Sequence, residues 1–161
     1  MLHTLLDKAK AILMKAFRQP ILDLFNKEDF FQMKIQTLRY WAKIINWVVT
    51  LDKTDLFSEY LEKVTLQSSF FSNESQENKK RIKSFERICF VIFSGEMNKY
   101  NNKLWTLVEK ISEVIKNCDT VHPGMLILIL FCVRILIMRL SPKQLNDLFK
   151  NIWPMLLTLL I

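Results

Sequence analysis

Apolar residues recur every three or four positions along almost the whole chain, and only two glycines, Gly95 and Gly124, interrupt its 161 residues. This spacing places apolar side chains along one face of a helix. Two glycines and four prolines leave little material for the tight turns that sheet architectures need. We therefore expect an all-α protein of about eight helices in antiparallel pairs, in a HEAT- or armadillo-like arrangement or an irregular helical bundle.

Short polar breaks divide the chain into these expected helices. A proline suits the first turn of a short second helix at Pro20, and Gly95 is expected as a left-handed cap at a helix end. The run Ser141-Pro142-Lys143-Gln144 has the pattern of a capping box with proline at the first helical position. The spacing predicts helices over residues 2–17, 20–25, 31–49, 79–93, 98–116, 125–140 and 142–149, with a last one from residue 152. A further helix, capped by Asp52 or Thr54, is expected to run to about residue 66.

The segment Met125–Leu140 is apolar nearly all round, which is typical of a helix at the centre of a protein. It is also a candidate for strands because of its isoleucines and valines, although its length and its lack of a central turn favour a helix. The run is too short to span a membrane, which takes roughly 18 apolar residues or more. We expect it to be the most buried helix, so that Leu130→Ala costs about 2–5 kcal/mol.

The length of the chain fits one helical domain over residues 1–161, and half of its residues are hydrophobic. The apolar segment from residue 152 to 161 stops abruptly, so we expect a C-terminal fragment of a much larger protein. The three cysteines, Cys89, Cys118 and Cys132, form no CxxC pair, and an odd number argues against a disulfide framework. These features indicate a reducing, cytosolic compartment.

Catalytic chemistry has few candidates in this sequence. His3 and His122 are the only histidines, and neither lies in a nucleophile motif. No cluster of histidine, cysteine and carboxylate residues with metal-ligand spacing is visible, and there is no glycine-rich loop for phosphate. We expect no enzyme activity, no catalytic or metal-binding residue, no cofactor and no small-molecule substrate.

A basic segment stands out within a net charge of +7. Its spacing places Lys80, Lys83 and Arg87 on one helical face, beside a polar stretch that contains two phenylalanines. Such a face can bind anionic lipid headgroups or nucleic-acid phosphates, or it can simply be solvated and balanced by nearby glutamates. The residues predicted to contact acidic lipid are Lys79, Lys80, Lys83, Arg87, Phe70 and Phe71.

Two arginines interrupt the apolar segment Met125–Leu140. Arg139 lies at the expected helix end, where the helix dipole favours a positive charge. Arg134 lies within the helix, where a guanidinium must be paired with a carboxylate or reach water. It is therefore either a buried, paired charge or part of a docking surface.

Four blocks, in order, carry a resemblance to the C-terminal domain of the Dopey family. The two most specific steps are Phe93-Ser-Gly-Glu96 and Arg139-Leu-Ser-Pro142 followed by Trp153-Pro154. The sequence departs from the family pattern at 73–80 and 146–151. The blocks are Leu24-Phe25 with Asp29-Phe-Phe-Gln-Met33, Trp41 in its helix, Phe85 through Gly95 to Tyr100, and Arg134 to Pro142 with Trp153-Pro154.

The resemblance implies a non-enzymatic, peripheral membrane protein on the cytosolic face of Golgi and endosome membranes. It implies a part in endosome-to-Golgi vesicle traffic and Golgi organisation, as a scaffold that works with a large Sec7-related protein. It also implies contact with acidic phospholipid. The alternative from the residues alone is a free-standing helical adaptor that binds an acidic protein or, less favoured, nucleic acid.

Overall fold

The computed structural model describes residues 2–51, 55–65, 74–116 and 123–158, and it contains helices and no strand within those ranges. The all-α prediction is confirmed. The helices are α1 (Leu2–Phe25), η1 (Phe30–Gln32), α2 (Ile35–Leu51), α3 (Leu56–Thr65), α4 (Glu74–Ser94), η2 (Asn101–Lys103), α5 (Leu104–Lys116), α6 (Pro123–Arg139) and α7 (Pro142–Thr158), where η1 and η2 are short 3-10 helices.

The chain divides into two compact units, Met1–Leu56 and Phe57–Ile161. The expectation of a single domain therefore stays a prediction. In the first unit α1 packs against α2, and an aromatic cluster joins the turn between them to α2. The Phe30 ring meets Phe25 and Trp41 edge-to-face, with ring centroids 5.0 Å and 5.2 Å apart. Such contacts stabilise a core beyond the burial of area alone.

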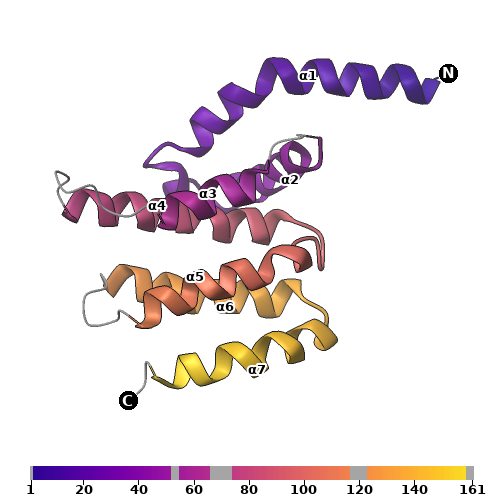
Figure 1. Ribbon diagram of the computed structural model, residues 1–161. Helices are drawn as coiled ribbons and strands as arrows, with labels where there is room; N and C mark the ends of the chain where they lie inside the picture. The colour runs from indigo at the N-terminus through magenta and orange to yellow at the C-terminus, as the bar shows by residue number, and fades with distance from the viewer. Residues whose placement is uncertain (1, 52–54, 66–73, 117–122, 159–161) are drawn as a thin grey trace. The chain divides into compact units, whose positions relative to one another are not determined.

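In the second unit, successive helices from α3 to α7 run in alternating directions (Figure 1). α4 lies beside α6, and α5 lies beside α7, so helices two apart in sequence are also neighbours in space. Successive helices are therefore antiparallel, as expected from the short connections, whereas the neighbours two apart in sequence run in the same direction. Apolar side chains from all five helices form the core, including Phe57, Ile88, Leu107, Ile129 and Ile152.

The central helix of this unit is α4, not α6. Every residue from Ser84 to Ile92 is buried except the half-buried Glu86. α6 is buried on one side only, and Leu130 is 57% exposed. The prediction that Met125–Leu140 is the most buried helix, with a fully packed Leu130, is therefore wrong. An all-round apolar sequence allows burial on every side, but only neighbouring helices can provide it.

The end of α4 and the start of α7 meet at Asn98. Its backbone amide donates to the carbonyl of Arg139 at 2.9 Å, and its Oδ1 accepts a hydrogen bond from the amide of Ser141 at 2.8 Å. Asn98 has a left-handed backbone with φ 64°, which an asparagine tolerates better than most residues. The helix start at Pro142 is confirmed. In a capping box the glutamine would accept the hydrogen bond from the backbone amide of the capping serine. Here Asn98 accepts that hydrogen bond from Ser141 instead.

Gly95 has no positive φ, so its predicted role as a left-handed cap is wrong. The lack of room for a side chain at this position explains the glycine instead. A Cβ at this position would lie 2.8 Å from Cε2 of Tyr100, and that ring is buried and stacked on Phe57 with centroids 5.2 Å apart. Because this ring is buried against Phe57, it has little room to move away, and a side chain at position 95 would clash with it.

Two prolines lie inside helices where the sequence suggested breaks. α1 continues through Pro20, and α7 continues through Pro154, so the separate helices expected at residues 20–25 and from residue 152 are not present. A proline removes one hydrogen bond and bends a helix without always ending it. Figure 1 shows α1 bent along its length.

Candidate interaction surfaces

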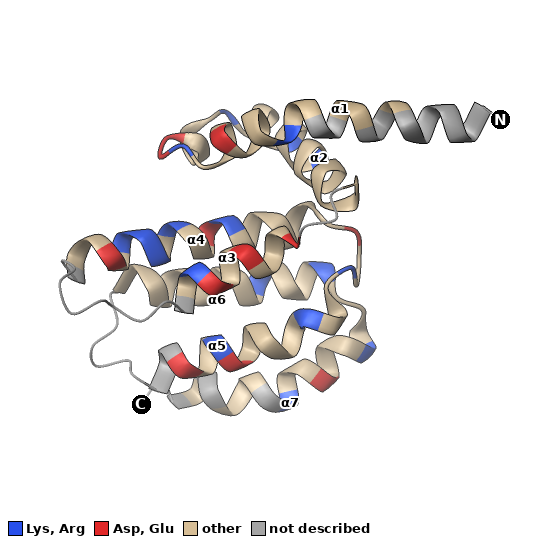
Figure 2. Cartoon of the chain, turned by 45° about the horizontal axis from the view of Figure 1, so that its top comes forward, with Lys and Arg blue, Asp and Glu red and all other residues tan. Residues whose placement is uncertain are grey.

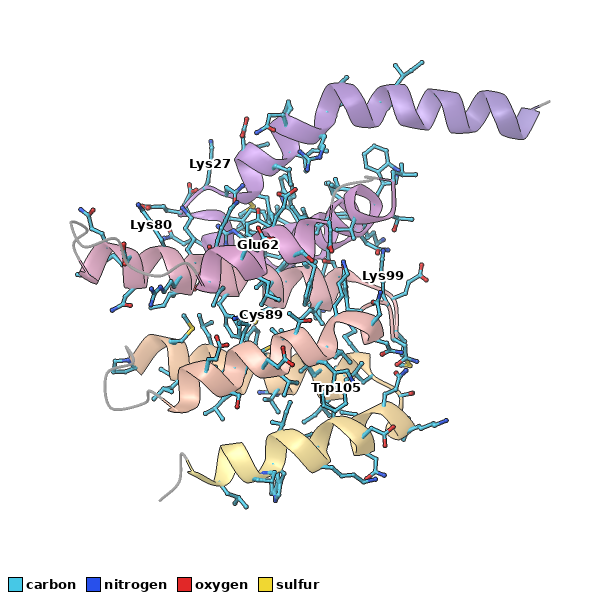
Figure 3. The ribbon with its side chains drawn as sticks, in the orientation of Figure 1. Lys27, Glu62, Lys80, Cys89, Lys99 and Trp105 are labelled. Atoms are coloured by element: carbon cyan, nitrogen blue, oxygen red, sulfur yellow. The ribbon has the colours of Figure 1, made fainter. Side chains whose placement is uncertain are left out.

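The N-terminal half of α4 carries the basic segment predicted from the sequence (Figure 2). Lys79 and Lys80 are exposed, and Lys83 is half-buried. Figure 3 shows Lys80 near the start of α4 and Cys89 farther along, between α4 and the helices that follow. The three lysines therefore lie on the part of α4 that precedes the core, where their ammonium groups can meet an anionic surface.

Arg87 does not belong to this surface, although it shares the spacing of the lysines. It is 1% exposed, so the prediction that it contacts a lipid headgroup is wrong. Burial lowers the pKa of its guanidinium, while the charge of Glu86 and then Tyr60 act in the opposite direction. Periodicity predicted the side of α4 on which Arg87 lies, but it could not show that α4 is enclosed on that side one turn beyond Lys83.

The remaining residues predicted to contact lipid, Phe70 and Phe71, lie outside the described residues. The neighbouring glutamate that was expected to balance the basic face is partly inside the fold. Burial raises the pKa of Glu86, and the positive charges of Arg87 and Lys83 offset part of that effect. The basic surface that the structure supports is therefore the lysine segment Lys79, Lys80 and Lys83.

Arg134 lies on the exposed side of α6. The interpretation as a buried, paired charge is therefore wrong, and the docking interpretation stays open. Its guanidinium has no ion pair with any residue in the described ranges. Around it α6 presents large apolar side chains that are 49–67% exposed, namely Ile127, Leu130, Phe131, Ile137 and Met138. We call these six residues the α6 face.

Arg139, five residues further along, is held differently. Its guanidinium carbon lies 4.9 Å from the centroid of the Phe93 ring, a cation–π contact, and its carbonyl accepts the hydrogen bond from Asn98. Arg139 also lies in the last turn of α6, the position that the helix dipole favours for a cation. No local pattern predicts this contact, because Phe93 and Arg139 are far apart along the chain.

A pair of thiols joins α4 to α6. Cys89 and Cys132 are both buried and free. A hydrogen bond with the Cys132 thiol and burial raise the pKa of Cys89 well above its ordinary value. A thiol in this environment stays protonated and acts as a small apolar group.

Metal binding and membrane crossing find no support in the parts of the chain that the structure describes. There, no three histidine, cysteine or acidic residues come together in a group that could hold a metal ion. Among the same residues, no helix is both long enough and apolar enough to cross a bilayer.

Comparison with known proteins identifies the class. The family model described as DOP1 C-terminal matches residues 1–161. Protein DOP1 homolog of Drosophila melanogaster is 28% identical over 147 residues, which cover 89% of this chain and 5% of that protein. Protein DOP1B of Xenopus laevis is 29% identical over 147 residues, which cover 91% of this chain and 6% of that protein. Protein pad-1 of Caenorhabditis elegans is 24% identical over 149 residues, with 90% and 6% covered.

An all-helical chain with these matches belongs to the DOP1, or Dopey, family, and it corresponds to the family's C-terminal region. The chain spans 5–6% of the length of the relatives named above. No solved structure gives a significant match. Two of the blocks that carry the resemblance, Phe85–Tyr100 and Arg134–Pro142, meet in the fold through Asn98 and through the Phe93–Arg139 contact.

Proposed function

We propose that this chain is a non-enzymatic module of a Dopey-like protein that binds acidic membrane surfaces through the lysine segment of α4. As a peripheral module it would serve a scaffold in endosome-to-Golgi traffic and Golgi organisation, on the cytosolic face of those membranes. A large Sec7-related protein is the proposed partner of the whole scaffold. These roles come from the family resemblance, and the lysine segment is the contribution of this chain.

The observation that carries the proposal is the placement of Lys79, Lys80 and Lys83 within less than two turns of one helix, outside the enclosed part of α4. Each lysine near an anionic bilayer contributes about 1 kcal/mol. Three would contribute about 3 kcal/mol, which corresponds to roughly a hundredfold in affinity. That is weak and reversible binding, as expected for a peripheral module that acts together with other parts of a long protein.

Liposome flotation tests the proposal. Vesicles of neutral phosphatidylcholine and vesicles with added phosphatidylserine or phosphatidylinositol 4-phosphate are mixed with the domain at low and high salt. We expect binding only to the acidic vesicles, with a loss as salt rises because exposed charges are screened. Replacing Lys79, Lys80 and Lys83 by glutamate is expected to abolish binding and to leave helicity by circular dichroism unchanged.

A matched control separates the site from the overall charge. Lys34, Lys43 and Lys143 are exposed lysines on or beside α2 and α7. Their replacement by glutamate lowers the net charge from +7 to +1, as does the α4 triple change. Equal loss in both triple variants, or binding to neutral vesicles, would refute the assignment to α4. A stronger shift with RNA or DNA than with vesicles would favour the nucleic-acid adaptor instead.

A further inference from the structure

The α6 face has the geometry of a helix-docking surface. Its members follow the spacing 127, 130/131, 134 and 137/138, and so lie within a stripe about 120° wide on a helix of 3.6 residues per turn. At 1.5 Å per residue the stripe is roughly 16 Å long, which matches three turns of a second helix. Contiguous exposed apolar patches of this kind mark sites of interaction on soluble proteins.

The position of Arg134 indicates which occupant fits. Arg134 lies on the midline of the stripe, and no residue of α6 is acidic. A helix that covers the apolar side chains would also cover this guanidinium and remove it from water. Burial of an uncompensated charge is strongly unfavourable, whereas a carboxylate placed opposite it can form a paired, hydrogen-bonded contact. The occupant must therefore be apolar at the edges of the contact and acidic at its centre.

A second copy of this chain fits poorly. Any two-fold pairing that buries the whole stripe brings two Arg134 side chains close together in an apolar interface. Like charges brought together in an apolar interface disfavour self-association. A bilayer also fits poorly. Helices that lie on membranes carry their cations at the edges of the polar face, with the midline of the apolar face uncharged.

We propose that the α6 face binds an amphipathic helix of a partner protein, whose apolar stripe carries a carboxylate that pairs with Arg134. In this mode of recognition the partner helix packs its apolar side on the α6 face, through side chains spaced three, four and seven residues apart. Ile127, Leu130, Phe131, Ile137 and Met138 provide the apolar contacts. Arg134 fixes the register, because only one alignment places the acidic residue opposite the guanidinium. This inference is independent of the lysine segment on α4.

A charge swap with designed peptides tests this proposal. The probe is a fluorescein-labelled, 21-residue helical peptide with leucines along one face and a single glutamate at the centre of that face. A second peptide has lysine at the same position. By fluorescence anisotropy, we expect the parent domain to bind the glutamate peptide about tenfold more tightly than the lysine peptide, a difference of 1.4 kcal/mol. Arg134→Glu is expected to reverse that order.

Apolar variants locate the contact. Leu130→Asp and Ile127→Ser, one turn apart toward the N-terminal end of the stripe, are both changes of exposed residues, so the fold should be retained by circular dichroism. Each is expected to weaken binding of the glutamate peptide at least tenfold, and hydrogen exchange should show protection by the peptide in residues 123–140. An unchanged peptide preference in Arg134→Glu, or unchanged affinity in both apolar variants, would overturn the proposal.

Two further measurements distinguish the other occupants. In sedimentation velocity the parent domain is expected to be monomeric, whereas Arg134→Leu, which removes the opposing charges, is expected to self-associate. A parent dimer that Leu130→Asp dissociates would assign the face to a second copy and overturn the proposal. Likewise, loss of liposome flotation in Leu130→Asp, with binding retained in the α4 triple lysine variant, would assign the face to a bilayer. Flotation of Leu130→Asp at the parent level supports the helix.

Discussion

α4 and α6 lie side by side in the same unit, yet the more highly charged of the two helices is the more deeply buried. α4 carries the densest charge in the chain and enters the core with Arg87 and Glu86 still on it. α6 has no acidic residue and is almost entirely apolar, but leaves one whole face exposed. The comparison shows that the position of a helix is set by the neighbours on each of its sides, and not by its own apolar content.

The two helices also differ in what a mutation should reveal. In α4 the side chains from Ser84 to Ile92 meet neighbours on several sides, so nearly every truncation leaves a cavity. In α6 the cost of a truncation should depend on the side of the helix from which the atoms are removed. Stability measurements can therefore test the comparison directly, residue by residue.

The largest effect is expected in α4. Phe85 is 2% exposed, and its replacement by alanine removes a whole ring from the core. We expect Phe85→Ala to lower the free energy of unfolding by about 3–5 kcal/mol, because the transfer energy of the ring and the cavity left behind add together. Urea unfolding followed by circular dichroism measures it. A loss below about 1 kcal/mol would show that α4 is not the central helix.

A smaller but sharper effect is expected from two adjacent residues of α6. Ile129 is fully buried, whereas Leu130 is 57% exposed. We expect Ile129→Ala to cost about 2–5 kcal/mol, and Leu130→Ala to stay within about 0.5 kcal/mol of the parent. The two variants remove similar amounts of apolar side chain from the same turn, so each is the control for the other. Equal costs would mean that the α6 face is covered within this chain.

The sequence predicted what depends on local pattern. Helix spacing identified the all-α class, and Ser141-Pro142 marked the start of α7 correctly. The same logic placed Arg87 in line with Lys80 and Lys83. Whether residues on one helical face are exposed or buried depends on which other helix packs against that face. The spacing of residues along a single helix does not contain this information.

The wrong predictions share one physical cause, which is that they rest on local sequence alone. The burial predicted for Leu130 and Arg134 rests on the apolar character of α6 itself, whereas their exposure depends on which side of α6 the neighbouring helices cover. Gly95 was interpreted from its local position at a helix end, but the reason for the glycine is the ring of Tyr100. Asn98, which joins two turns 43 residues apart, has no local signal that separates it from any other polar residue in a loop.

The smallest expected effect concerns Glu86, the carboxylate that α4 carries beside its core. Burial raises the pKa of Glu86 above its ordinary value, with Arg87 and Lys83 acting against the rise. The folded state therefore binds this proton more tightly than the unfolded state does. As the pH rises from the ordinary pKa through the raised one, the unfolded chain releases its proton first, so this residue lowers the stability over that window.

Glu86→Gln removes that titration. We expect the difference in unfolding free energy between the variant and the parent to move in favour of the variant as the pH rises from 4 to 7, in urea titrations at each pH. Leu130→Ala on α6 changes no ionisable group and should follow the pH profile of the parent. If Glu86→Gln also follows the parent profile, the Glu86 carboxylate is solvated in the folded state. α4 would then carry one charge fewer into the core, and its contrast with α6 would rest on Arg87 alone.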